Sequence, residues 1–116
     1  MLNNVSLVGR VTRDPEMRTT NGGKTLAVFT LAVQRTKDEA DFIPCEAWEK
    51  TAESLRDYVT KGSMIGVEGS IRVENYEVDG AKKTFTKVRA DRVHFILLTP
   101  KEDSAPRTDA EIAGRY

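Results

Sequence analysis

A long run of alternating apolar and polar residues leads into a turn dipeptide in the second half of the chain. Within residues 64–77 the apolar residues Ile65, Val67, Ile71 and Val73 take odd positions, and Glu68, Arg72, Glu74 and Tyr76 take even ones, the period of a strand with one buried face. Asp79-Gly80 then favours a type I′ turn, whose twist matches that of its two strands. In the resulting register Ile71 faces Val88 and Val73 faces Thr86, on the side that we expect to face the core. The chain must therefore contain a long antiparallel ribbon.

Three further strands and one helix are predicted from the rest of the chain. The strands are expected at residues 4–12, 25–33 and 41–48, and the helix at residues 51–62, capped by Thr51 and followed by Gly62 in a left-handed conformation. Pro44 cannot donate a backbone hydrogen bond, so we place it at a sheet edge or a bulge. The apolar positions change parity after Ala90, which predicts a bulge near Asp91.

Five strands with one helix between the third and the fourth predict an all-β fold, the five-stranded OB barrel. The length of 116 residues allows one domain, which we place at residues 1–99. Residues 100–116 have little to bury and are predicted to form a flexible C-terminal tail. The polar start is no signal peptide, and no apolar run reaches the roughly 18 residues of a membrane span. We therefore expect a cytoplasmic protein.

The residues of common catalytic and metal sites are scarce. His94 is the only histidine and Cys45 the only cysteine, so neither a disulfide within the chain nor a zinc site can be assembled. We expect no enzyme, no metal and no cofactor. The chain has 18 Lys+Arg and 18 Asp+Glu, a formal net charge of zero, whereas nucleic-acid-binding domains usually show a basic excess. A nucleic-acid partner must therefore be judged from where the cations lie.

The even positions of the predicted ribbon carry aromatic and cationic residues. They are Arg72, Glu74 and Tyr76 on one strand, opposite Lys87, Phe85 and Lys83 on the other. Aromatic rings stack on nucleobases at about 1–3 kcal/mol each and cations contact phosphates, so this face suits a single-stranded nucleic acid. The alternative is that the two rings cover a neighbouring apolar surface and that the lysines are ordinary solvated charges.

A second pair of aromatic residues, Phe42 and Trp48, shares one face of the predicted strand 41–48. Small and aliphatic residues around Cys45 take the other face and suit a core. The two large rings then point outward and indicate a binding surface, which Lys50 continues on the same parity provided that the strand extends to it. The alternative for this surface is packing between subunits.

Further cations cluster near the first two strands. Arg10, Arg13 and Arg18 surround the first strand and its turn, and Arg35 and Lys37 flank the loop after the second. Each alone is an ordinary surface charge, and acidic residues lie among them. Together with the aromatic residues they can line a groove for a polyanion.

A series of motifs follows in order along the chain. They are residues 4–10 (NVSLVGR), 14–18 (DPEMR), 21–23 (NGG), 29–33 (FTLAV), 48–53 (WEKTAE), 61–63 (KGS) and 67–69 (VEG). Together they resemble the bacterial-type single-stranded DNA-binding protein family over residues 1–98. The resemblance implies an OB fold, usually assembled as a homotetramer, that wraps single-stranded DNA without sequence preference in replication, repair and recombination.

The resemblance also implies roles for single residues. Aromatic rings of the family stack on bases at positions matched by Phe42, Trp48 and Tyr76, and basic residues contact phosphates at positions matched by Lys50 and Arg72. To these we add residues from the hairpin register and from the cationic clusters: Phe85 for stacking, and Arg10, Arg18, Arg35, Lys83 and Lys87 for phosphate contacts.

The chain departs from the family pattern in two places. The loop 35–40 lacks an aromatic residue that some members use for stacking, and Lys37 lies near its place, so we expect an electrostatic contact there. Members commonly end in a Gly-, Pro- and Gln-rich linker and an acidic tip that recruits replication and repair proteins. Residues 100–116 match neither, so recruitment through this end is not expected.

The sequence thus predicts a sequence-independent single-stranded DNA-binding protein that coats and protects DNA near the nucleoid as a homo-oligomer, a tetramer in most of the family. The alternative is an OB-fold accessory factor of the replication machinery, whose exposed aromatic residues bind other proteins.

Overall fold

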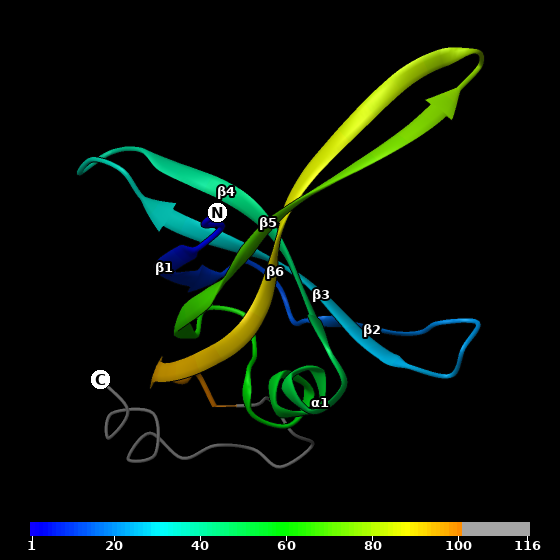
Figure 1. Cartoon of the computed structure of the whole chain (residues 1–116). Coiled ribbons are helices and arrows are strands. Elements are labelled where there is room, and N and C mark those ends of the chain that lie inside the picture. The colour runs from blue at the N-terminus through cyan, green and yellow to red at the C-terminus, as the bar shows by residue number, and fades with distance from the viewer. Residues whose placement is uncertain (101–116) are drawn as a thin grey trace, which may run out of the picture.

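Strands of the protein pair around a ring that one helix covers at its lower end (Figure 1). The computed structural model describes residues 1–100. Its elements are β1 (Val5–Val11), β2 (Glu16–Thr19), β3 (Thr25–Gln34), β4 (Ala40–Trp48), α1 (Glu49–Tyr58), β5 (Met64–Val78) and β6 (Ala81–Leu97). No helix among these residues is long and apolar enough to cross a membrane.

The ring runs β1-β5-β6-β4-β3 and closes where β3 pairs with β1 again. All of these pairings are antiparallel except that of β4 with β6. The helix α1 lies between β4 and β5 in the chain. A closed ring of five strands with this one helix is the OB barrel, so the predicted fold class is confirmed.

The core fills the ring and the space beneath it. Its largest fully buried side chains include Leu31, Leu55 and Ile65. The helix contributes an apolar stripe to this core, since Ala52 and Leu55 are buried and Val59 is buried just after the last turn. The inward face of β4 is also as predicted, with Cys45 and Ala47 buried. Burial raises the pKa of the Cys45 thiol to about 12, so this cysteine stays protonated.

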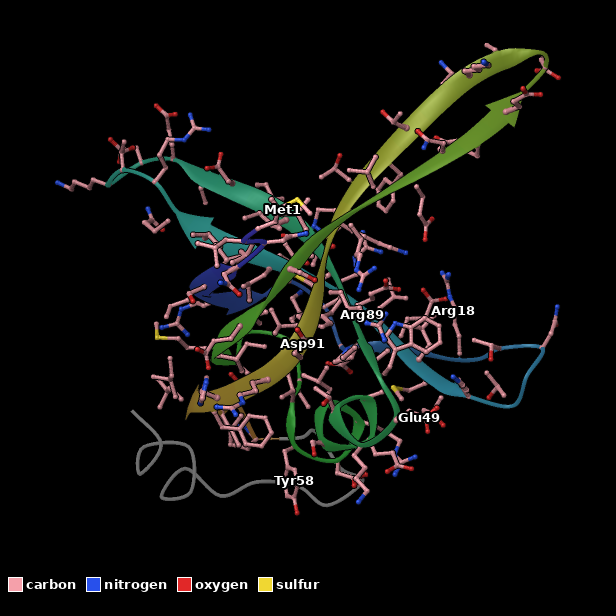
Figure 2. The ribbon with its side chains drawn as sticks, in the orientation of Figure 1. Met1, Arg18, Glu49, Tyr58, Arg89 and Asp91 are labelled. Carbon is pink, nitrogen blue, oxygen red and sulfur yellow. The ribbon has the colours of Figure 1, made fainter. Side chains whose placement is uncertain are left out.

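The hairpin β5–β6 has the predicted turn and register. Asp79 and Gly80 both have positive φ values, 51° and 80°, as a type I′ turn requires. Ile71 pairs with Val88. The predicted bulge is also present, because the pairing passes from Glu68↔Arg92 to Gly69↔Ala90 and leaves Asp91 as the extra residue (Figure 2).

The prediction that Ile71 and Val73 face the core is wrong, since they are 46% and 54% exposed. The core side of the ribbon ends near Val67 and Val88, which are both buried. Beyond them the hairpin leaves the barrel as a free arm (Figure 1). Alternation along a strand shows which residues share a face, but it does not show how far the barrel covers that face.

Two further features differ from the prediction: the structure has an additional short strand, and the helix has other limits. The short strand β2, which lies between the strands expected at residues 4–12 and 25–33, pairs with β3 across residues 21–23, where Gly23 has a φ of 80°. The helix begins at Glu49, so Thr51 lies inside it and is no cap. It ends at Tyr58, and Gly62 (φ 90°) turns the following loop, where its N–H donates to the Val11 carbonyl at 2.7 Å.

The remaining strand prediction concerns Pro44, which pairs with Thr30 of β3 on one side. On the other side the pairing of β4 with β6 begins only at Cys45, so Pro44 lies on an open edge as expected. The predicted tail lies outside the described residues except for Pro100. The boundary between residues 99 and 100 therefore stays a prediction.

Candidate nucleic-acid interface

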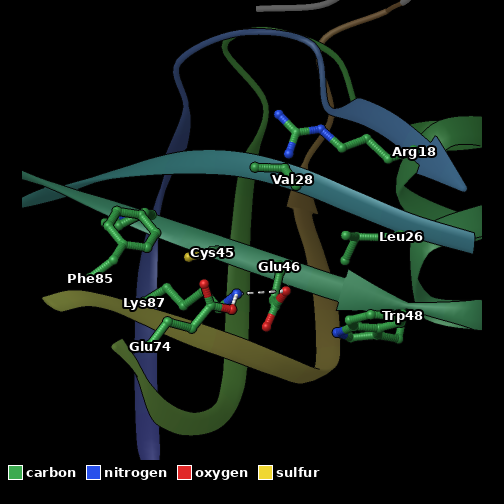
Figure 3. Close-up of a pocket in the computed structure, with 10 residues that line it drawn as sticks. Arg18, Leu26, Val28, Cys45, Glu46, Trp48, Glu74, Phe85 and Lys87 are labelled. Carbon is green, nitrogen blue, oxygen red and sulfur yellow. Dashed lines mark hydrogen bonds and ion pairs between the residues drawn. The ribbon is translucent and has the colours of Figure 1, made fainter. Parts of the chain in front are cut away.

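A pocket of about 350 Å³ lies where the base of the β5–β6 arm meets β4 (Figure 3). Trp48 and Glu46 line it from β4, Arg18 from β2, and Phe85 and Lys87 from β6. The pocket thus brings together four residues that the sequence selected separately: Trp48, Phe85, Arg18 and Lys87.

The backbone fixes Trp48 at the point where β4 turns into α1. Trp48 is extended, and the next residue, Glu49, has a φ of 56°, which turns the chain directly from strand to helix. The ring is half-buried, and its Nε1 is buried without a hydrogen-bond partner among residues 1–100. Trp48 is therefore more enclosed than the outward orientation that the sequence predicted.

Arg89 is a residue of this site that the sequence analysis missed. Its guanidinium carbon lies 5.6 Å from the centroid of the Trp48 ring, within cation–π range. Arg89 follows Phe85 and Lys87 at a period of two on β6. Extending the alternation by one more step would have found it.

Phe42 lies elsewhere, near the loop that joins β3 to β4. Its register partner is Ala32, and the residue is 68% exposed. Between Phe42 and Trp48 the face of β4 is covered rather than open, since Glu46 is only 7% exposed. The two rings predicted on one surface are thus separated by a buried carboxylate.

The arm carries its aromatic residues on one face, as the register predicted. Glu74 pairs with Phe85, and Tyr76 pairs with Lys83. Both rings are exposed. Because successive side chains of a strand alternate between faces, Arg72, Glu74 and Tyr76 follow one another along the same side of β5.

The predicted phosphate-binding cations fall into two groups. Within the described part of the chain, Lys50, Arg72 and Lys83 form no ion pair, and Arg10 donates to the Gly62 carbonyl at 2.9 Å. The other three have carboxylate partners: Arg18 with Glu16 at 2.9 Å, Arg35 with Asp41 and Glu39, and Lys87 with Glu46 and Glu74.

Lys87 is the most enclosed of these cations. Its Nζ lies 3.2 Å from Glu46 Oε2 and also donates a hydrogen bond to Glu74, and its side chain is 14% exposed. Burial acts to lower the pKa of Lys87, but the hydrogen bonds to Glu74 and Glu46 outweigh it and raise that pKa above the ordinary lysine value. The ammonium is therefore charged at neutral pH.

The closed ring of five strands with one helix defines an OB-fold protein, and aromatic rings and cations line its pocket and one side of its arm. The family model described as "Single-strand binding protein family" matches residues 2–96, and the chain belongs to this family.

Several curated relatives are similar over most of this chain. A protein of Listeria monocytogenes named "Single-stranded DNA-binding protein 2" is 46% identical over 111 residues, which are 90% of this chain and 68% of the relative. "Single-stranded DNA-binding protein A" of Bacillus subtilis is 46% identical over 87% of this chain and 62% of its own length. "Single-stranded DNA-binding protein" of Staphylococcus aureus is 45% identical, with shares of 94% and 73%. The chain thus spans about two thirds of the length of these relatives.

Proposed function

We propose that this protein binds single-stranded DNA without sequence preference and coats it during replication, recombination and repair. The observation that carries the proposal is the grouping of aromatic rings with cations. Trp48 and Phe85 line the pocket together with Lys87, and Tyr76 lies on the β5–β6 arm together with Arg72 and Lys83. Every base offers a π-face, so stacking on such rings tolerates any sequence. Membership of the single-strand binding protein family and the names of the relatives agree with this function.

We propose that the bound DNA strand runs along the barrel and the β5–β6 arm. Bases stack at the pocket on Trp48 and Phe85, and along the arm on Tyr76. Phe42 supplies a further stacking surface beside the β3–β4 loop. An OB fold covers about 4–16 nucleotides, which leaves room for such separated contacts.

Phosphate contacts are proposed first for the cations without carboxylate partners. Lys50, Arg72 and Lys83 form no ion pair in the region that the structure describes, so they bind a phosphate without first leaving a partner. Arg10, Arg18, Arg35 and Lys87 stay in the proposed set, but the last three must exchange a carboxylate for a phosphate. The function consists of binding alone, without a chemical step.

We also propose that the protein assembles as a homotetramer in the cytoplasm, at the nucleoid. Ile71 and Val73 support an interface between copies, because they are apolar, lie next to each other on one face of the arm, and are about half exposed. A second copy would remove this apolar surface from water, which is the usual drive for assembly. Light scattering of the protein with and without oligo-dT measures the number of copies.

A length series of oligo-dT tests the function. We expect fluorescence anisotropy to show affinity that rises with oligonucleotide length up to the site size, weak binding to duplex DNA of the same length, and weaker binding as salt rises. An affinity that is negligible at every length would contradict the proposal. That outcome would favour the alternative, an OB-fold accessory factor whose exposed aromatic residues bind protein.

A further inference from the structure

Lys87, Glu46 and Glu74 form a charged cluster in the wall of the pocket (Figure 3). The three side chains come from β6, β4 and β5, and both carboxylates pair with the same ammonium group. With all three groups ionised, two negative charges oppose one positive charge. The cluster therefore adds negative charge at a place where we propose that a polyanion binds.

The two carboxylates of the cluster differ in their surroundings. The Glu46 side chain is 9% exposed, so losing Lys87 would leave its charge buried and unpaired. The Glu74 side chain is 58% exposed, so water already solvates it and can replace the ammonium at little cost. Only the Glu74 contact is suited to exchange.

The position of Glu74 on the arm indicates what would replace it. Glu74 lies between Arg72 and Tyr76 on the same side of β5, and its register partner is Phe85. A strand whose bases stack on Tyr76 and Phe85 must carry its phosphates past this point. A phosphate and a carboxylate are both anions that accept hydrogen bonds from an ammonium group.

We propose that Glu74 occupies, in the free protein, the place at Lys87 that a phosphate of bound single-stranded DNA takes. The inference rests on the proposed function. Glu74 acts as an internal competitor: it holds Lys87 against Glu46 while DNA is absent and turns to solvent when DNA arrives. The charge of Glu74 lowers the affinity for DNA. It also makes the affinity depend less steeply on salt, because the carboxylate released from Lys87 offsets one phosphate contact.

Replacing Glu74 by Gln should therefore strengthen DNA binding. Glu74→Gln leaves the buried Glu46–Lys87 pair intact, so the fold is kept. We expect affinity for oligo-dT to rise about fivefold at low salt, since Lys87 then meets a phosphate without a competitor. The slope of log affinity against log salt should also steepen by about 0.7, the value for one phosphate of a single strand, because no released carboxylate then offsets that contact.

Two control variants separate this mechanism from a general effect of charge. Glu77→Gln makes the same charge change on the same strand, but residue 77 has odd parity, lies on the opposite face, and forms no ion pair within residues 1–100. The triple variant Glu46→Gln, Glu74→Gln, Lys87→Gln has the same net charge as Glu74→Gln but lacks the ammonium. Its neutral side chains leave no unpaired charge in the pocket.

The experiment measures oligo-dT affinity by anisotropy for the four proteins between about 50 and 200 mM salt, after urea unfolding has shown that each is folded. The proposal expects the gain in affinity and slope in Glu74→Gln alone. An equal gain in Glu77→Gln or in the triple variant would overturn it, because bulk charge would then explain the effect. Wild-type binding without a gain in Glu74→Gln overturns the inference but leaves the proposed function standing. No binding by the wild type to oligo-dT contradicts both.

Discussion

The guanidinium of Arg89 lies against the ring of Trp48, with 5.6 Å between the guanidinium carbon and the ring centroid. Trp48 ends β4 and Arg89 lies on β6 two residues before the bulge at Asp91, so the contact joins two strands of the barrel. A cation at the ring restrains the indole at a site where we propose that a base stacks. The contact thus connects the part of β6 next to the bulge with the proposed DNA-binding surface at Trp48.

Arg89→Ala should weaken binding of oligo-dT by about 1 kcal/mol. The Trp48 indole then loses the cation that restrains it, and the bound DNA loses a nearby positive charge. Arg89→Lys keeps the charge but loses the planar group, so its affinity for oligo-dT should lie between those of the wild type and Arg89→Ala. Anisotropy titrations of the three proteins measure the effect. Arg92→Ala is the matched control on the same strand. Equal losses in Arg89→Ala and Arg92→Ala would show that the contact with Trp48 has no special role.

Phe42→Ala should lower DNA affinity by about 1–3 kcal/mol and leave stability unchanged. Phe42 is 68% exposed, so it contributes little to the core and its ring can stack on a base. Phe42→Leu keeps an apolar side chain without the π-face and should lose nearly as much affinity. Calorimetry with oligo-dT and urea unfolding measure the two quantities. Full affinity in Phe42→Ala would remove this residue from the proposed path.

Gly69→Ala should destabilise the protein by at least about 2 kcal/mol, because the bulge leaves no space at this position. An added Cβ would lie 1.8 Å from the Arg89 carbonyl oxygen. Gly66 lies on the same strand, where a Cβ would lie 3.5 Å from the Cβ of His94, an ordinary contact. Gly66→Ala should therefore cost much less. Equal urea midpoints for the two variants would show that the barrel does not need the close approach at Gly69.

The carboxyl of Glu68 should titrate below its ordinary pKa of about 4.3. A hydrogen bond with His94, whose Nε2 lies 2.6 Å from Glu68 Oε2, is the main cause that lowers the pKa of Glu68, and Arg92 adds to it. Because folding lowers the pKa of Glu68, the ionised carboxylate stabilises the folded state. This stabilisation is present above the unfolded-state pKa and is lost as pH falls through the folded-state pKa. In His94→Ala the NMR titration of the Glu68 carboxyl should move back toward the ordinary value. An unchanged midpoint would rule out His94 as the cause.

Much of the fold could be predicted from local features of the sequence. Asp79-Gly80 sets the turn and the register of the arm, and the change of parity after Ala90 places the bulge at Asp91. These features are encoded by neighbours in the chain. The exposure of Ile71 is not, because it depends on where the core ends, and the core is built from distant segments.

The candidate site could be predicted only in part, for the same reason. Phe42 and Phe85 are exposed as the alternation indicated. Lys87, however, is enclosed by Glu46 of a strand that pairs with β6 in parallel, and no local pattern reveals that pairing. Arg89 could have been found by extending the period along β6, whereas its contact with Trp48 required the structure.

The most direct test of the proposed function uses the fluorescence of Trp48, which is the only tryptophan in the sequence. A base that stacks on the indole should quench its emission, so titration with oligo-dT should give saturable quenching that high salt reverses. Duplex DNA of equal length should cause little change. Unchanged emission at oligo-dT concentrations that saturate binding in an anisotropy assay would contradict stacking on Trp48, and with it the binding site described for this protein.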